Sequence, residues 1–186
     1  MNNNRIHKVL LYIIITSSLF FLNGCSIKVV DKYSPSILMS GKGNVNVEMF
    51  RYLPAEEGKL EKNQIDTGSG LTPIYTEENI DKLVTDAVMK EFKFIGYTLD
   101  SSAQRVIAGD ILEWSVDYIG FHGDFLTKIQ FFIYDNSSGK RKEIYSKVHE
   151  GKLRLSKFQQ GPSGYITLTD AIESFLKDAQ KEKVLN

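Results

Sequence analysis

The chain has 186 residues with 23 basic and 23 acidic side chains, so its formal net charge at pH 7 is zero with histidine neutral. This balance excludes the basic field with which proteins attract nucleic acids or anionic membranes, and we expect no nucleic-acid partner. A single cysteine cannot form a disulfide within the chain, so the fold must depend on its apolar core. The length predicts one domain.

Residues 1–24 predict an export signal. Arg5 and Lys8 precede an uncharged run that extends from Val9 to Leu22. A membrane-spanning helix needs about 20 apolar residues, so this run is short for a span and typical of the apolar region of a signal peptide. The alternative is an uncleaved membrane anchor. Because both basic residues lie in this leader, the rest of the chain is slightly acidic.

The single cysteine follows directly after this leader. Leu22-Asn23-Gly24-Cys25 resembles the lipobox of bacterial lipoproteins, with Asn23 in place of the usual small residue. The resemblance implies that the Cys25 thiol carries a diacylglycerol, that fatty acids such as palmitate anchor the mature chain, and that the membrane is one partner. More than one acyl chain makes such anchoring stable. Ser26, where Asp would imply inner-membrane retention, implies the periplasmic face of the outer membrane in a Gram-negative cell. A small buried core residue is the alternative for a lone cysteine.

Residues 25–42 show no sustained hydrophobic period and predict a lipidated tether, followed by a single domain over residues 43–186. The first strand is expected over residues 44–52, where apolar and polar residues alternate. The polar stretch 54–74, with its glycines and prolines, predicts a mobile or functional loop.

The clearest helix is predicted to begin at Thr76, a good N-cap residue, and to end at Gly96, where a left-handed residue belongs. Its apolar stripe is wide enough to predict a core-facing helix, with a partner-binding face as the alternative. The stripe consists of Ile80, Leu83, Val84, Ala87, Val88, Phe92 and Ile95.

Three strands are then expected, over residues 104–118, 125–135 and 142–155, with a hairpin turn at Gly139 between the last two. A second helix is predicted to begin at Thr167 or Thr169. Strands in a run beside two helices predict the α+β class, with an antiparallel sheet of about four or five strands and both helices packed on one face.

The turn between the first two of these strands carries aromatic side chains that look exposed. Tyr118, Phe121, His122 and Phe125 form a candidate interaction surface, because exposed aromatic residues mark sites of association. An exposed sheet edge is the other expected docking site.

No catalytic, metal-binding or cofactor-binding residue is predicted, and we expect no enzyme activity. His122 and His149 lack the spacing of zinc ligands, and no nucleophile-elbow motif is present. His149 is expected to be exposed on its strand. A hydrolase would require His122 to reach Asp124 and a nucleophile in a cleft.

Residues 79–114, in which a helix leads through Gly96-Tyr97 to a strand containing Gly109, resemble YajG-type outer-membrane lipoproteins and the auxiliary lipoproteins of envelope ABC transporters. The resemblance implies a non-catalytic envelope lipoprotein that presents a small α+β domain to a protein partner or an envelope assembly. The alternative is a lipid- or small-ligand-binding auxiliary of an envelope transporter, which would need a pocket between helix and sheet.

Overall fold

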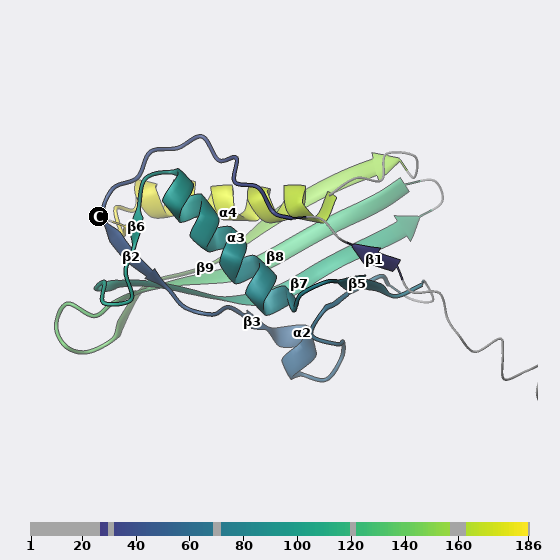
Figure 1. Ribbon diagram of the computed structural model, residues 1–186, viewed down its shortest axis with the longest axis horizontal. Coiled ribbons are helices and arrows are strands. Elements are labelled where there is room, and N and C mark those ends of the chain that lie inside the picture. The colour runs from purple at the N-terminus through teal and green to yellow at the C-terminus, as the bar shows by residue number, and fades with distance from the viewer. Residues whose placement is uncertain (1–26, 30–31, 69–71, 120–121, 157–162, 186) are drawn as a thin grey trace, which may run out of the picture.

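The computed structural model describes residues 27–29, 32–68, 72–119, 122–156 and 163–185. Its elements are, in chain order, β1 (Ile27–Val29), β2 (Asn44–Val47), β3 (Arg51–Tyr52), α2 (Leu53–Glu56), β4 (Gln64–Ile65), β5 (Ile74–Thr76), α3 (Ile80–Phe94), β6 (Thr98–Leu99), β7 (Arg105–Ile119), β8 (His122–Asp135), β9 (Lys142–Ser156) and α4 (Ser163–Lys181). The α+β class is therefore correct (Figure 1).

The main sheet has six strands in the order β6-β2-β7-β8-β9, and β3 pairs with β7 beyond the end of β2. β7, β8 and β9 form the predicted antiparallel meander. β2 and β3, however, both lie parallel to β7. The predicted all-antiparallel sheet of four or five strands is therefore wrong in detail: the sheet is mixed, because the chain returns through α3 before β7 begins and so runs beside β2 in the same direction.

α3 and α4 cross the same face of this sheet, and the short α2 is a third helix (Figure 1). The core lies between the two long helices and the sheet. At its centre the rings of Phe131 from β8 and Phe175 from α4 stack with centroids 4.2 Å apart, and Phe92 of α3 packs against Phe175. All three side chains are 0% exposed. The helix–sheet interface is thus filled by side chains.

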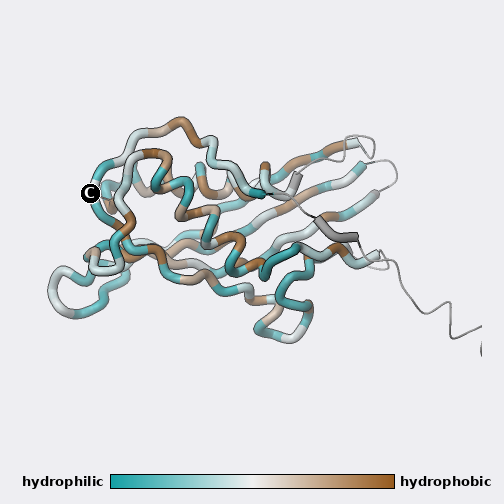
Figure 2. Tube along the Cα trace, viewed as in Figure 1, coloured by the Kyte–Doolittle hydropathy of each residue, from teal (hydrophilic) through white to brown (hydrophobic). Residues whose placement is uncertain are grey.

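α3 confirms the predicted amphipathic helix, since its tube alternates between polar and apolar residues (Figure 2). It begins later than predicted: Asn79 is the N-cap, and Thr76 lies in β5, where its hydroxyl donates to the Glu78 carbonyl. Gly96 ends the helix as expected, with φ at 109°, and the Tyr97 amide donates back to the Phe92 carbonyl.

The stretch 54–74 is more ordered than the predicted loop. It contains α2 and β4, and β4 pairs with β5 in a small second sheet of order β1-β5-β4. Ile65 and Thr67 are both buried. Asp66 joins the small sheet to the main one, because it forms a parallel bridge with Ser115 of β7. This stretch therefore carries part of the core.

The segment predicted as a tether is also packed against the domain where the structure describes it. Tyr33 and Ile37 are 7% and 2% exposed and belong to the core. We call residues 33–41 the strap, because they follow α3 on the side away from the sheet, as described below. The folded part of the chain thus begins before residue 43.

Candidate functional site

The predicted lipid attachment at Cys25 lies outside the described residues and stays a prediction. The structure begins at Ile27, the first residue of β1. Two residues of chain span at most about 7 Å, so the Cys25 α-carbon lies within that distance of Ile27. An acylated Cys25 would therefore hold the domain close to a membrane, instead of at the end of a long tether.

The pairing of the small sheet fixes the direction in which the chain enters the domain. β1 is parallel to β5, and β5 is antiparallel to β4. Asp66, directly after β4, bridges in parallel to Ser115 of β7. β1 therefore runs opposite to β7, and its first residue points to the end of the molecule where β7 ends and β8 begins (Figure 1).

Apolar side chains gather at this end of the sheet. The rings of Tyr118 and Phe125 pack edge to face with centroids 6.3 Å apart. Leu153 lies opposite Phe125 in the ladder, and His122 is the exposed first residue of β8. We call the set Tyr118, His122, Phe125, Leu153 and Leu155 the tip surface; its apolar members are all half-buried.

The structure thus brings together Tyr118 and Phe125 of the predicted interaction surface and places His122 on the same hairpin, whereas Phe121 lies outside the described residues. Burial raises the pKa of the Tyr118 phenol. Leu153 and Leu155 were not predicted as part of this surface, although their alternation with charged residues at the end of β9 indicates that they share one face.

A hydrolase would need Asp124 to bond His122, but the structure pairs Asp124 with an arginine. Asp124 accepts two hydrogen bonds from Arg154, at 2.7 and 2.9 Å, in a bidentate pair across β8 and β9. Because Arg154 bonds both carboxylate oxygens, the charge of Asp124 is balanced by a cation across the strands.

His149 is buried, at 8% exposure, which corrects the prediction of an exposed histidine. Its Nε2 lies 2.6 Å from the Tyr145 hydroxyl, and its Nδ1 lies 2.9 Å from the Ser174 hydroxyl on α4. The Tyr145 hydroxyl donates to Asp178, and Lys147 donates to the same carboxylate at 2.8 Å. Burial lowers the pKa of His149, so the imidazole is neutral at pH 7.

A serine beside a neutral histidine invites a comparison with catalytic dyads, but the setting differs. Ser174 lies inside α4, where backbone amides donate to carbonyls of the preceding turn. Amides engaged in this way cannot stabilise an oxyanion at Ser174. The network instead fixes α4 on β9. Tyr145, Lys147 and His149 are every second residue of β9, so they lie on one face of the strand. This spacing is visible in the sequence alone.

A second buried polar centre holds the strap. Glu91 of α3 is 0% exposed. Its carboxylate accepts hydrogen bonds from the Tyr33 hydroxyl at 2.5 Å and from the backbone amides of Ser36 and Ile37 at 3.0 and 3.2 Å. Burial, followed by the bond to Glu91, raises the Tyr33 pKa. The carboxylate thus binds three donors from the strap.

The strap also reaches α4, so it lies along both helices. The Tyr33 hydroxyl lies 3.1 Å from the Thr169 hydroxyl, and the Gln180 side-chain amide donates to the Ser40 carbonyl. Near its other end the Gly41 amide donates to the Ile95 carbonyl. Leu38, between these contacts, is 91% exposed.

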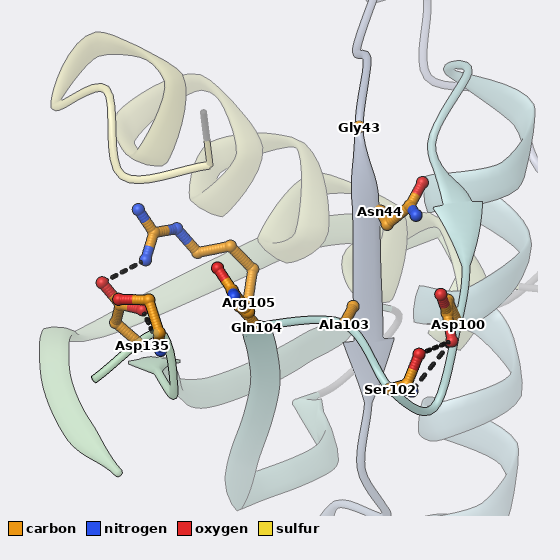
Figure 3. Close-up of a pocket in the computed structure, with 9 residues that line it drawn as sticks. Gly43, Asn44, Asp100, Ser102, Ala103, Gln104, Arg105 and Asp135 are labelled. Atoms are coloured by element: carbon orange, nitrogen blue, oxygen red, sulfur yellow. Dashed lines mark hydrogen bonds and ion pairs between the residues drawn. The ribbon is translucent and has the colours of Figure 1, made fainter. Parts of the chain in front are cut away.

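A polar hollow of about 550 Å³ opens at the opposite end of the long strands, between the turn before β7 and the end of β8 (Figure 3). Arg105 and Asp135 pair across it at 2.7 Å. The Ser137 backbone amide and Arg105 lower the pKa of Asp135 to about 2. The hollow is lined by Gly43, Asn44, Asp100, Ser102, Ala103, Gln104, Arg105, Asp135 and Ser137. Arg105 and Asp135 neutralise each other, and the third charged side chain of the lining, Asp100, accepts hydrogen bonds from Ser102.

Among the residues that the structure describes, no group of three or more histidine, cysteine or acidic side chains is placed to hold a metal ion. Within the same residues, no helix is long and apolar enough to cross a membrane.

Comparison with known proteins shows the fold. No family model matches the sequence, and no curated protein matches it. Protein XCC0632 from Xanthomonas campestris, assigned to the family model DUF330, superposes with a TM-score of 0.55 at 11% identity, over 84% of this chain and 93% of that one. Hypothetical protein CT253 from Chlamydia trachomatis gives 0.53 at 12% identity, over 75% of this chain and 96% of that one.

A third structure, lipoprotein GNA1162 from Neisseria meningitidis, covers 77% of this chain at 12% identity, but its TM-score of 0.28 carries no argument. At these identities the first two structures are similar in fold alone. Neither of their names describes an enzyme. The expected resemblance to YajG-type or transporter lipoproteins is not specifically matched by these structures.

Proposed function

We propose that this chain is a non-catalytic lipoprotein of the bacterial envelope, anchored through Cys25 at the periplasmic face of the outer membrane, whose domain binds a protein partner through the free edge of β9. The sequence of the leader and Cys25 supports the anchor. The observation that carries the partner proposal is the position of β9 as the last strand of the main sheet.

β9 is a long strand with an open outer edge. It spans Lys142–Ser156, and within the described residues only β8 pairs with it. Unpaired main-chain groups of such an edge can accept an added strand from a partner. Val148, in the middle of β9, is 49% exposed, and it lies on the sheet face opposite to its neighbour His149, which contacts α4. An extended segment added beside β9 would cover this valine.

Exposed lysines along β9 limit pairing of this edge with unrelated strands. Lys142, Lys147 and Lys152 are exposed along β9, and lysines on an edge strand disfavour pairing with arbitrary chains. Lys147 is held by Asp178 and by Glu182 of the α4 C-terminal end. A partner segment that brings carboxylates to Lys142 and Lys152 would suit the edge best.

The alternative function, binding of a lipid or small ligand as part of a transporter, required a pocket between helix and sheet. Phe92, Phe131 and Phe175 fill that space. The polar hollow lies elsewhere, at the ends of the strands, and is lined by polar groups unsuited to a lipid. We therefore propose protein binding over ligand binding.

The test places a photo-crosslinking amino acid at Val148 of the lipidated protein in intact cells, with Ser138 in the β8–β9 turn as the control position. A partner captured at Val148 alone is identified by mass spectrometry and purified. Hydrogen exchange of the complex should then slow at β9 amides and leave the central β7 unchanged. Protection confined to another surface, or equal capture at both positions, would contradict edge binding.

A further inference from the structure

We propose that the tip surface lies in the headgroup region of the same membrane that holds the acyl chains of Cys25, as a second, protein-made contact with lipid. The proposal rests on the proposed anchoring at Cys25 and adds an orientation to it. The tip surface consists of Tyr118, His122, Phe125, Leu153 and Leu155.

The strand pairing fixes the level at which the anchored chain enters the domain. Ile27 lies opposite Ile74, and Ile74 lies opposite Ile65. The next residue, Asp66, bridges Ser115 and receives its hydrogen bond from Val116. Ile27 therefore lies level with the residue before Ser115, on β7.

The hairpin of β7 and β8 extends well beyond that level. β7 continues to Ile119, which pairs with His122 at the end of the ladder. From the level of Ile27 this is a rise of about 17 Å at roughly 3.3 Å per residue. The connection back to Cys25 spans at most about 7 Å, even if it is fully extended in the same direction. The tip therefore projects about 10 Å or more beyond the Cys25 backbone along the strands, by the same strand geometry.

A projection of this size reaches into the bilayer surface. The headgroup layer on each side of the hydrocarbon core is about 5–8 Å thick. Protein segments bound at this interface bury their apolar side about 5–10 Å deep. With the acyl chains of Cys25 in the membrane and the strands standing upright, the end of the hairpin occupies this layer.

The chemistry of the tip surface suits the interface. Tyr118 has an apolar ring and a polar hydroxyl, a combination enriched where membrane meets water. Phe125 and the two leucines add apolar area. The charged neighbours Asp124 and Arg154 are paired with each other, so neither enters the interface as an isolated charge. Because the opposite charges of Asp124 and Arg154 balance each other within the described residues, we expect the contact to be insensitive to salt.

Lipid is favoured over a protein as the occupant because of the covalent link. A membrane partner is brought to this end of the domain by an anchor only two residues before β1, whereas no feature of the tip surface selects a protein segment.

The test uses the full lipidated protein in vesicles of phosphatidylethanolamine and phosphatidylglycerol. His122→Cys and Ser138→Cys, both exposed and near opposite ends of β8, each receive an environment-sensitive fluorophore. We expect iodide in the aqueous phase to quench the fluorophore at residue 122 several-fold less than the one at residue 138. Lipids with a spin label near the headgroup should quench residue 122 alone. Equal iodide quenching at both sites would overturn the proposal.

A second comparison tests the tip chemistry. Replacing Leu153 and Leu155 by Ser in the His122→Cys protein should restore most of the iodide quenching, whereas Val148→Ser should not. Shielding that persists in the double serine variant would show that anchoring alone causes it and would refute the role of the tip surface. Shielding that appears only in native membranes with their proteins would refute lipid as the occupant.

Failure of the anchor is distinguishable from failure of this inference. If Cys25 is not acylated, its thiol takes a second fluorophore and the protein does not remain with the vesicles. If the protein is acylated and vesicle-bound but residue 122 stays open to iodide, only the orientation is wrong.

Discussion

Replacing Glu91 by alanine should release the strap and destabilise the whole domain. The Glu91 carboxylate is 0% exposed and accepts hydrogen bonds from the Tyr33 hydroxyl and the amides of Ser36 and Ile37. Truncation leaves these three donors without their acceptor, at a cost of about 1–3 kcal/mol for each donor that stays buried. Since the strap can move into water, we expect a total loss of about 3–5 kcal/mol, below the sum of three full penalties.

The assay is urea and thermal unfolding of a chain that starts at Ser26, combined with hydrogen exchange. For a domain of this size each kcal/mol shifts the melting temperature by about 2–4 °C, so Glu91→Ala should lower it by about 6–20 °C. The Ser36 and Ile37 amides should exchange faster. Glu91→Gln keeps an acceptor and should cost only about 1–2 kcal/mol.

A matched control is Glu173→Ala on α4, whose carboxylate pairs with Lys177 at the surface. Exposed pairs of this kind contribute about 0.3–0.5 kcal/mol. Equal midpoints for Glu91→Ala and Glu173→Ala, together with unchanged exchange at Ser36 and Ile37, would refute the reasoning that Glu91 holds the strap.

Three further predictions concern other parts of the molecule. Cys25→Ala should abolish labelling by a fatty-acid analogue in cells, and a variant labelled as strongly as the original chain would end the lipoprotein proposal. The lowered pKa of His149 means that, on acidification, the unfolded chain takes up a proton before the folded chain does. The contribution of His149 to stability should therefore be constant above the unfolded pKa of about 6.5 and fall as the pH drops below it. His149→Asn should remove this part of the pH dependence in urea titrations, and identical profiles for the two proteins would contradict the prediction. Gly151→Ala should destabilise by about 1–3 kcal/mol or more, because the added methyl would overlap the Thr167 carbonyl oxygen of α4, and a calorimetric melting temperature equal to that of the original chain would show that α4 does not pack so closely.

Local patterns predicted most of the meander. The strands expected over residues 104–118 and 142–155 appear as β7 and β9 with bounds that differ by one residue. Alternation of apolar residues and the hairpin turn at Gly139 were sufficient, because each depends on residues near in sequence. The apolar stripe of α3 was equally local, and of its seven members only Leu83 is half-buried instead of buried.

The parallel placement of β2 and the role of the strap could not be predicted in this way. Both depend on partners far along the chain, and the strap sequence shows no period. Gly109 illustrates the limit: a glycine inside a strand often marks a bulge or a close backbone approach, but here the ring of Phe50, the residue before β3, occupies the space above it. The register shift in β7 lies instead between Ile111 and Glu113.

The candidate site likewise combines local contacts, which the sequence could predict, with long-range contacts, which it could not. Tyr118 and Phe125 could be grouped from one hairpin, whereas Leu153 and Leu155 join them only through the ladder between β8 and β9. The burial of His149 likewise comes from α4 packing over its strand, and a single strand pattern cannot show which face a later helix will cover.

The hydrogen bonds of the strap connect residues that are 136 and 140 positions apart, from Tyr33 to Thr169 and from Ser40 to Gln180. The strap, near the start of the chain, can therefore complete its contacts only after the last helix has been synthesised. Until α4 has emerged, the apolar surfaces of α3 and of the growing sheet stay open to solvent, and a nascent chain of this kind should depend on chaperones for as long as its C-terminal part is missing.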